Sequence, residues 1–354
     1  MKKLLILSLF VLIGGISCNT QEKEVVCEEH TLTGRQFPNE ILSTYPSLSM
    51  VNDNLMITSS RTSPVFSLYE IGKDSLELIS TYGTVGHAGN EYIFIRSVVS
   101  FGDTIVIHDG TRQGSKIFTL LYNSENQQFE ELSIEKPIPS PDSRLGGENR
   151  IRKLENGEYV GMSICASDKI FGLYDKDLNF KRHFGEFKFI EGANDINIVN
   201  YMQGAFGSNK NNVVLALGRL PYIVMYAVEG DSIVKKWDDE VVPMVVKVDG
   251  VDIKFDKERS IGFFTQVGMS DDYIFALYYD KSLFESYETP ISASNIVYVY
   301  NYDGQRVAKL TLTEAIFGSI CPSRDGTKLY STDAETSCIV EYDLSDLEFM
   351  KNRK

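Results

Sequence analysis

Several features that divide or characterise long chains are missing from this sequence of 354 residues. It has no extended helical periodicity, which argues against a helical fold. It has no proline-, glycine- or serine-rich linker and no break in composition that would separate two domains. The chain is nevertheless longer than one small hydrophobic core usually holds. These absences together favour a single domain assembled from repeated units that pack on their neighbours.

Signatures of catalysis are equally scarce. The sequence contains neither a Gly-x-Ser-x-Gly nucleophile turn nor a Gly-x-x-x-x-Gly-Lys-Ser/Thr phosphate loop. Its histidines stand at isolated positions, without the paired spacing of a zinc site: His30, His87, His108 and His183. We therefore predict no catalytic residue, no metal and no cofactor. Carboxylates are abundant, however, and two acids that face each other across a cleft have no sequence signature, so an enzyme stays open as an alternative.

The N-terminus indicates export. Residues 1–17, MKKLLILSLFVLIGGIS, combine two lysines, an apolar run and small residues, which is the pattern of a secretory signal peptide rather than of a membrane span. The string from Gly15 to Cys18 resembles the lipobox of bacterial lipoproteins, in which the cysteine is diacylated and becomes the mature N-terminus. This resemblance implies a lipid anchor on Cys18, followed by a polar tether over residues 18–24. An ordinary signal peptide with a chance cysteine is the alternative.

The charge narrows the choice of partners. The formal net charge is −14, and removal of residues 1–17 would make it −16, because that segment carries Lys2 and Lys3 but no acid. So acidic a protein is not expected to bind nucleic acid or to be attracted electrostatically to anionic lipid headgroups. We expect an exported domain, residues 25–354, that is held to the cell envelope by its lipid, with the outer membrane as the expected location.

A repeat of about fifty residues runs through this domain. Its first element, a polar turn followed by a strand-like run, recurs with spacings of 49, 54, 55, 60 and 55 residues, beginning at Asn54, Asp103, Gly157, Asn212, Asp272 and Thr327. A second series of apolar strands follows these, beginning at Val65, Ile117, Ile170, Tyr222, Asn295 and Cys338. Two interleaved series with one period are the expected mark of blades around an axis. The sequence therefore predicts an all-β fold, a six-bladed β-propeller with four-stranded antiparallel blades.

The strand count also predicts how the ring closes. Five blades leave room for a fourth strand, but the sixth ends near Met350 without one. We expect residues 25–30, VVCEEH, to return as the outer strand of the last blade, because an N-terminal strand would cover its exposed edge. Cys27 would then lie beside the strand that begins at Cys338. An exported compartment permits a disulfide between these two cysteines, and two free thiols are the alternative.

The segment between the first two predicted blades carries a glycine-rich motif. Residues 83–92, GTVGHAGNEY, contain glycines that allow a sharp path from an outer strand back towards the axis. This segment resembles the glycine-rich turn, ending in Glu and an aromatic residue, of the six-bladed, TolB-like propeller lipoproteins common in gut-type anaerobes. Residues 323–333, SRDGTKLYSTD, are similar to the Ser-Pro-Asp-Gly repeat of TolB. The resemblance implies a membrane-anchored propeller and supplies no catalytic residue.

Alignment of the predicted blades points to a candidate binding site. In propellers the start of the innermost strand lines the mouth of the central channel, where ligands or partners dock. Those strands begin near Ser47, Arg96, Arg150, Gln203 and Gln266. The two arginines would be cations near the axis of an acidic protein, and with the two glutamine amides they form a candidate site for an anion or polar ligand. The alternative is that the arginines brace neighbouring blades by pairing with acids such as Glu91 and Glu148.

These observations predict a lipid-anchored propeller of the cell envelope that acts as a binding or scaffolding module for a protein, peptide or glycan ligand. The alternative is an envelope hydrolase or lyase that acts on glycans or peptides through a carboxylate pair in the funnel. An enzyme of that kind would hold two acids roughly 5 to 10 Å apart in a pocket. A binding module would instead present aromatic and amide groups there.

Overall fold

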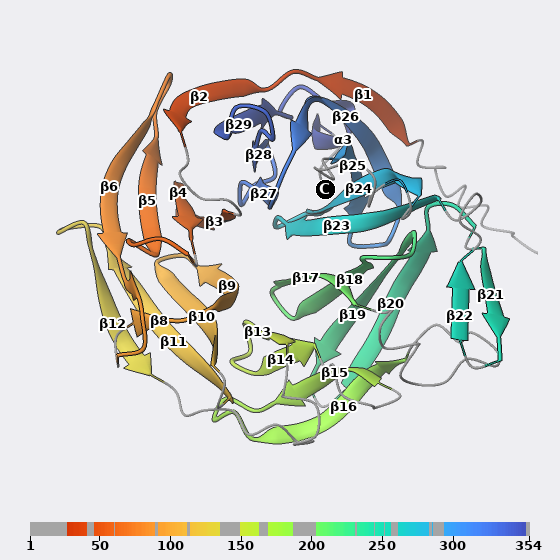
Figure 1. Cartoon of the computed structure of the whole chain (residues 1–354), viewed down its shortest axis with the longest axis horizontal. Helices are drawn as coiled ribbons and strands as arrows, with labels where there is room; N and C mark the ends of the chain where they lie inside the picture. Colours follow the sequence, from red (N-terminus) through yellow and green to blue (C-terminus); the bar gives the residue numbers. More distant parts are fainter. Residues whose placement is uncertain are drawn as a thin grey trace, which may run out of the picture.

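The computed structural model describes residues 27–40, 46–59, 61–88, 91–111, 114–134, 149–162, 169–186, 203–230, 232–243, 245–250, 252–255, 261–282, 285 and 294–351. Nearly all of these residues lie in strands. Six antiparallel sheets stand around a central opening (Figure 1), which confirms the six-bladed β-propeller. The predicted signal peptide, the tether and Cys18 lie outside the described residues.

Each blade begins at the axis and adds its strands outwards in chain order. The first blade contains β3 (Ser47–Val51), β4 (Asn54–Thr58), β5 (Phe66–Ile71) and β6 (Leu76–Tyr82). The second contains β9 (Ile95–Phe101), β10 (Thr104–Thr111), β11 (Gly114–Asn123) and β12 (Gln128–Ile134). The third contains β13 (Asn149–Lys153), β14 (Tyr159–Met162), β15 (Lys169–Tyr174) and β16 (Phe180–Glu186).

The remaining blades follow the same plan. The fourth contains β17 (Gly204–Asn209), β18 (Asn212–Leu217), β19 (Tyr222–Glu229) and β20 (Ser232–Glu240). The fifth contains β23 (Ile261–Met269), β24 (Tyr273–Ser282), β25 (Ser294–Asn301) and β26 (Arg306–Ile316). The sixth contains β27 (Cys321–Pro322), β28 (Lys328–Thr332) and β29 (Cys338–Asp343), and the short helix α3 (Glu348–Lys351) follows it. A separate hairpin, β21 (Val246–Asp249) and β22 (Asp252–Phe255), projects beside the fourth and fifth blades (Figure 1).

The repeating polar turns form the hairpins between the first two strands of each blade. Positive φ angles occur in these turns at Asn52, Gly102, Gly157, Lys210 and Gly326. Glycine reaches such angles without steric cost, and a positive φ at a turn matches the right-handed twist of the flanking strands. The turn residues therefore determine where each inner strand ends, which is why the repeat was visible in the sequence.

The hydrophobic core is divided among the contacts between blades. Six clusters of buried residues are present among the described residues, and each spans one pair of neighbouring blades. Between the first and second blades, Tyr92 packs against Phe66 and Phe118, with ring centroids 5.2 and 4.9 Å apart. Between the third and fourth blades, Phe171 packs against Phe206, with ring centroids 5.4 Å apart. Large aromatic side chains thus fill the wedges between blades, as expected for a propeller.

The ring is closed by an N-terminal strand, but not by the predicted residues. The strand β2 (Arg35–Glu40) pairs antiparallel with β29 and completes the sixth blade, and its Phe37 is fully buried. The preceding strand β1 (Glu28–Leu32) instead pairs in parallel with β26, as a fifth strand of the fifth blade. The prediction that residues 25–30 form the closing strand was therefore wrong: the closing strand is β2, a few residues further along the chain. Two successive strands cover two neighbouring edges, seen at the top of Figure 1.

This register also separates the two cysteines. Cys27 directly precedes Glu28, which pairs with Ala308 of the fifth blade, whereas Cys338 pairs with Glu40 of the sixth. Both thiols are free in the structure, so the predicted disulfide is not formed. Cys27 is exposed, and partial burial together with nearby Glu29 and Glu28 raises the pKa of its thiol against the opposing effect of Arg306 and Lys309.

The glycine-rich segment makes the predicted sharp return to the axis. Two short strands within it, β7 (Thr84–Val85) and β8 (Glu91–Tyr92), pair in parallel. Gly83 has a φ of +77°, and a Cβ there would stand 2.7 Å from the Tyr92 ring. The Glu91 carboxylate accepts a hydrogen bond from the Ala88 amide at 2.8 Å, which closes the loop. The segment thereby connects β6 to β9 and places Tyr92 in the wedge between two blades.

Candidate functional site: the central tunnel

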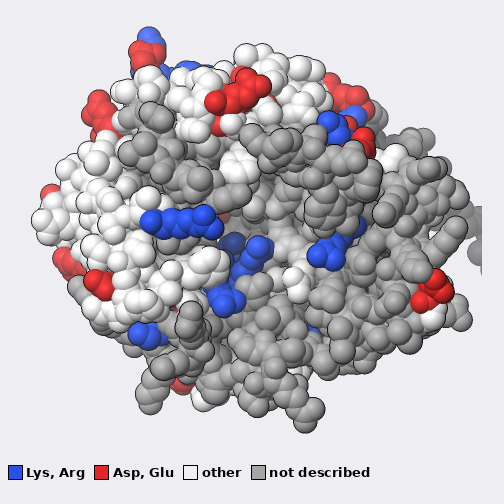
Figure 2. Space-filling view, viewed as in Figure 1, with Lys and Arg blue, Asp and Glu red and all other residues white. Residues whose placement is uncertain are grey.

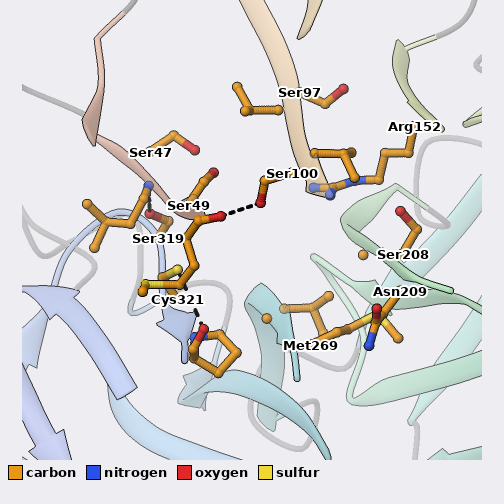
Figure 3. A pocket seen from close by; sticks show the side chains of 18 of the residues that line it. Ser47, Ser49, Ser97, Ser100, Arg152, Ser208, Asn209, Met269, Ser319 and Cys321 are labelled. Atoms are coloured by element: carbon orange, nitrogen blue, oxygen red, sulfur yellow. Dashed lines mark hydrogen bonds between the residues drawn. The ribbon is translucent and has the colours of Figure 1, made fainter. Parts of the chain in front are cut away.

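A cavity of about 860 Å³ runs along the axis of the propeller. The inner strands of all six blades line it, from the start of β3 at Ser47 to hairpin turns at its other end, such as those at Asn52 and Lys210. Its wall is polar, and serines recur on several blades (Figure 3). We call this cavity the tunnel.

Charge is distributed unevenly around the tunnel opening. On the face drawn in Figure 2, lysine and arginine side chains gather around the central hollow, whereas most of the aspartates and glutamates lie towards the rim. The whole protein has an excess of acids, with a formal charge of −14. A local positive charge at a concave site in an acidic protein favours binding of an anion there over the rest of the surface.

Three of the four predicted funnel residues line the tunnel. They are Arg96 on β9, Arg150 on β13 and Gln266 on β23. Gln203 precedes β17, has an exposed side chain and is not among the lining residues, so the four do not form one site. Gln266 lies at a register shift in the pairing of β23 with β24, which makes the start of that inner strand irregular.

Arg96 packs tightly against its own blade. A Cβ on Gly110 of the neighbouring strand β10 would stand 2.0 Å from the Arg96 Nε, so only glycine leaves room for the guanidinium there. The Arg96 guanidinium also lies 5.8 Å from the centre of the Phe94 ring. Burial, and secondarily the nearby Arg96 charge, lowers the pKa of His108 to about 3. His108 is therefore neutral, and its Nδ1 accepts a hydrogen bond from the Ile151 amide at 2.8 Å.

Arg150 occupies an irregular backbone position. It lies at a register shift in the pairing of β13 with β14, and its φ of 63° is in the left-handed region. A residue other than glycine adopts that conformation at a cost of roughly 1 to 2 kcal/mol, and a bulge of this kind re-aims the side chain. The Arg150 side chain donates a hydrogen bond of 2.7 Å to the backbone carbonyl of Gly204 on β17. It therefore braces the third blade against the fourth, through a carbonyl rather than through the predicted acids.

The acids predicted as braces for the arginines were Glu91 and Glu148. Glu91 accepts the Ala88 amide in the glycine-rich loop, and Glu148 lies outside the described residues. Burial lowers the pKa of Arg150. Bracing is thus observed for Arg150, but its partner is the main chain of the next blade.

Arg152, two residues further along β13, was not recognised in the sequence. Its guanidinium lies over the ring of Phe206 on β17, 5.5 Å from the ring centre, and the side chain extends into the tunnel (Figure 3). Burial, with a contribution from the Arg150 charge, lowers the pKa of Arg152 to about 10. Its Nε is buried and has no hydrogen-bond partner among the described residues. Alternation along β13 could have indicated it, since Arg152 follows Arg150 at the spacing of one strand face.

Several tunnel serines hold the blades together. Ser97 donates to the carbonyl of Ile151 and Ser100 donates to that of Met50, so β9 is joined to the inner strands on both sides. Ser319 accepts the amide of Leu48 at 2.7 Å, joining the sixth blade to the first. These contacts are partly drawn in Figure 3. They fix the spacing of the inner strands and so define the width of the tunnel.

The carboxylates that line the tunnel lie in hairpin turns at its far end. Among the described lining residues they are Asp53, Glu155 and Asp271, from the first, third and fifth blades. Asp271 forms an ion pair of 3.1 Å with Arg324 of the sixth blade. In the part of the chain that the structure describes, no group of three histidines, cysteines or acids is arranged to hold a metal ion. The described helices also include none long and apolar enough to cross a membrane.

Comparison with known proteins supports the fold. No protein-family model and no curated protein matches the sequence. The structure is similar to the crystal structure of a protein of Bacteroides fragilis described as a "putative exported protein", with a TM-score of 0.58 and 14% sequence identity. The similarity covers 90% of this chain and 99% of the other. At this identity the likeness concerns the fold alone, and it extends over the whole propeller.

Proposed function

We propose that this protein is an exported, lipid-anchored propeller of the cell envelope that binds a protein, peptide or glycan ligand in its central tunnel. The observation that carries the proposal is the tunnel itself. It is a cavity of about 860 Å³ in which arginine, glutamine and serine side chains from different blades converge. Concave sites with a few convergent polar groups are the usual binding sites of rigid scaffolds.

Export and anchoring rest on the N-terminal sequence. Residues 1–17 have the pattern of a signal peptide, and Cys18 follows as in a lipobox. The described body begins at Cys27 with β1 and β2 on the outside of the ring, so the tether would leave the propeller from its rim. An anchor at the rim leaves both ends of the tunnel accessible, and the outer membrane is the location we propose.

The arrangement of acids favours binding over hydrolysis. A glycosidase pair needs two carboxylates that face each other across the bond to be cleaved. Here the described carboxylates of the tunnel wall sit in turns of alternate blades, and Asp271 is neutralised by Arg324. The middle of the tunnel is instead lined by cations and hydroxyl groups, which suit recognition of a ligand.

A capture experiment with a plugged tunnel tests the proposal. The full-length lipoprotein, immobilised from detergent, is incubated with solubilised envelopes of its own host, and bound proteins, peptides and glycans are identified by mass spectrometry. The variant Ser49→Trp places a large ring on β3 in the tunnel wall, where Ser49 is partly exposed (Figure 3). We expect a component that wild type captures to be lost from this variant.

A second variant controls for charge and handling. The double variant Lys235→Gln, Lys236→Gln changes β20, the outermost strand of the fourth blade. Both lysines form surface ion pairs there. This variant should capture the same component as wild type. If the plugged variant captures it equally well, the tunnel is not the binding site and the proposal fails. Incorporation of a labelled fatty acid, abolished by Cys18→Ala, tests the anchor separately.

A further inference from the structure

Two cations, Arg150 and Arg152, line the tunnel on one strand, and no described acid compensates their charge. Among the described groups, no carboxylate stabilises the charged form of Arg150 or Arg152. The positive charge of Arg150 instead disfavours the charged form of Arg152 and contributes to its lowered pKa. Holding two partly desolvated guanidinium groups close together is unfavourable unless an anion is present, because neither burial nor mutual repulsion is offset. The third blade therefore carries an electrostatic cost that its own described residues do not relieve.

Both arginines face the same edge of the fourth blade. Arg150 reaches the carbonyl of Gly204 and Arg152 lies over Phe206. Gly204, Phe206 and Ser208 are alternate residues of β17, so their outward directions share one face of that strand. The next position on this face after Phe206 is thus Ser208, which also lines the tunnel (Figure 3).

Two hydrogen-bonding groups, one on β13 and one on the facing side of β17, have no partner in the described part of the chain. The Arg152 Nε and the Ser208 Oγ are both buried, and neither makes a hydrogen bond with a described residue. A buried donor left without an acceptor costs roughly 1 to 3 kcal/mol. These two groups come from neighbouring blades and belong to residues that line one cavity.

We propose that Arg150, Arg152 and Ser208 form a binding site for an oxyanion, the carboxylate, sulfate or phosphate group of a ligand that enters the tunnel. Arginine suits this role because its planar guanidinium presents several N–H donors to the oxygens of such a group. Arg150 uses one donor for Gly204 and keeps others for the ligand. The inference deepens the proposed function and rests on it, since it names the chemical group by which the tunnel would recognise its ligand.

The strained backbone at Arg150 agrees with this assignment. A left-handed, bulged residue persists where the surrounding structure requires it, and such positions gather at binding sites. The second blade holds the bulge at Arg150 in place, because the amide of the following residue, Ile151, donates a hydrogen bond to His108 on β10. The second blade thus fixes the strand that presents both arginines.

Calorimetric titration of the full-length protein in detergent tests the site. The probes are sodium glucuronate, glucose 6-sulfate and inorganic phosphate, each at an ionic strength held constant with sodium chloride, with glucose as the neutral control. We expect at least one oxyanion to bind wild type and glucose to bind at least tenfold more weakly. Comparison among the three probes shows which oxyanion fits. Arg152→Gln should weaken oxyanion binding at least tenfold, and Ser208→Ala should weaken it by a smaller factor.

Two controls keep a folding defect apart from a loss of binding. The double variant Lys235→Gln, Lys236→Gln should bind the probe as wild type does. The melting temperature of Arg152→Gln without a probe should equal or exceed that of wild type, because the substitution removes an uncompensated charge. Equal affinity of wild type and Arg152→Gln, or no preference of wild type for any oxyanion over glucose, would overturn the inference.

The outcome also separates this inference from the proposed function. If Ser49→Trp abolishes capture of the envelope component while Arg152→Gln retains it fully, the tunnel binds its ligand through other chemistry, and only the oxyanion site is wrong. If neither variant affects capture, the tunnel is not the binding site at all. Loss of capture in both variants, with oxyanion binding by wild type, supports both.

Discussion

The hydroxyl of Tyr92 is a buried polar group whose removal should cost little. The ring fills the wedge between the first two blades, but its hydroxyl makes no hydrogen bond with any residue that the structure describes, and burial raises the pKa of the phenol. We expect Tyr92→Phe to leave the free energy of unfolding unchanged or to raise it by up to about 1 kcal/mol. Tyr92→Ala should lower it by about 3 to 5 kcal/mol, because the wedge would be empty. Urea denaturation of both variants measures this; a clear loss in Tyr92→Phe would reveal a partner for the hydroxyl.

His108 should make the protein sensitive to acid. Its pKa is lowered by burial to about 3 in the folded state, against an ordinary value near 6.5. Between these two values the unfolded chain binds a proton that the folded chain does not, so this contribution to stability is complete above pH 6.5 and is lost as the pH falls towards 3. At pH 5 the loss should be about 2 kcal/mol, since each pKa unit corresponds to about 1.4 kcal/mol.

The variant His108→Asn isolates this effect. Asparagine keeps an acceptor oxygen for the Ile151 amide but does not titrate. Burial raises the pKa of the adjacent Asp109, an opposing effect that is present in both proteins and cancels in the comparison. Between pH 7.5 and pH 5, wild type should lose about 2 kcal/mol more of its unfolding free energy than the variant. Parallel losses in the two proteins, measured by denaturation at each pH, would contradict the assignment.

At the scale of elements, the two N-terminal strands have different roles. β2 completes the sixth blade and buries Phe37 in the cluster shared with the first blade, whereas β1 adds a fifth strand to a blade that already has four. Phe37→Ala should therefore lower the free energy of unfolding by about 3 to 5 kcal/mol. Thr31→Ala on β1, where the side chain is exposed, should change it by less than about 0.5 kcal/mol. Equal effects of the two substitutions on urea denaturation would show that β2 does not close the ring.

Pairing of the N-terminal strands illustrates what the sequence could and could not determine at this scale. A missing outer strand in the sixth blade predicted that an N-terminal strand would close the ring. It did not determine which segment, because residues 28–32 and 35–40 are both short strand-like runs, and either could cover an open edge. In the structure Gly34, just before β2, packs closely on β29, where a Cβ would clash with Val340 and Tyr342. Close approach of this kind is a tertiary property.

The candidate site was predictable only in part for a similar reason. Arg96, Arg150 and Gln266 were placed in the tunnel from the spacing of the turns alone. Arg152 follows Arg150 at the spacing of one strand face and could have been noticed, but nothing in the sequence shows that β13 faces β17, so the pairing of Arg152 with Ser208 was missed. Gln203 directly precedes β17, but the lining on this strand begins only at Phe206; where a strand starts is the feature least determined by sequence.

At the scale of the whole molecule, the fold follows from the repeat. Each blade contributes one inner strand to the tunnel and one face to each neighbouring cluster, so six similar units produce both a divided core and a continuous axial cavity. Function enters where the units differ. Within the inner strands, arginines on the second and third blades, and on the fourth a hydroxyl with no partner among the described residues, distinguish one side of the tunnel from the other.

Native mass spectrometry of the protein, purified from the cells that produce it without denaturation, tests most directly whether the tunnel is a ligand site. Wild type should carry additional mass that corresponds to a bound, acid-bearing ligand, and the same mass should be absent from Ser49→Trp and reduced in Arg152→Gln. The double variant Lys235→Gln, Lys236→Gln should retain it. A ligand mass present at equal occupancy in wild type and in both tunnel variants would contradict the account, because the ligand would then bind elsewhere on the propeller.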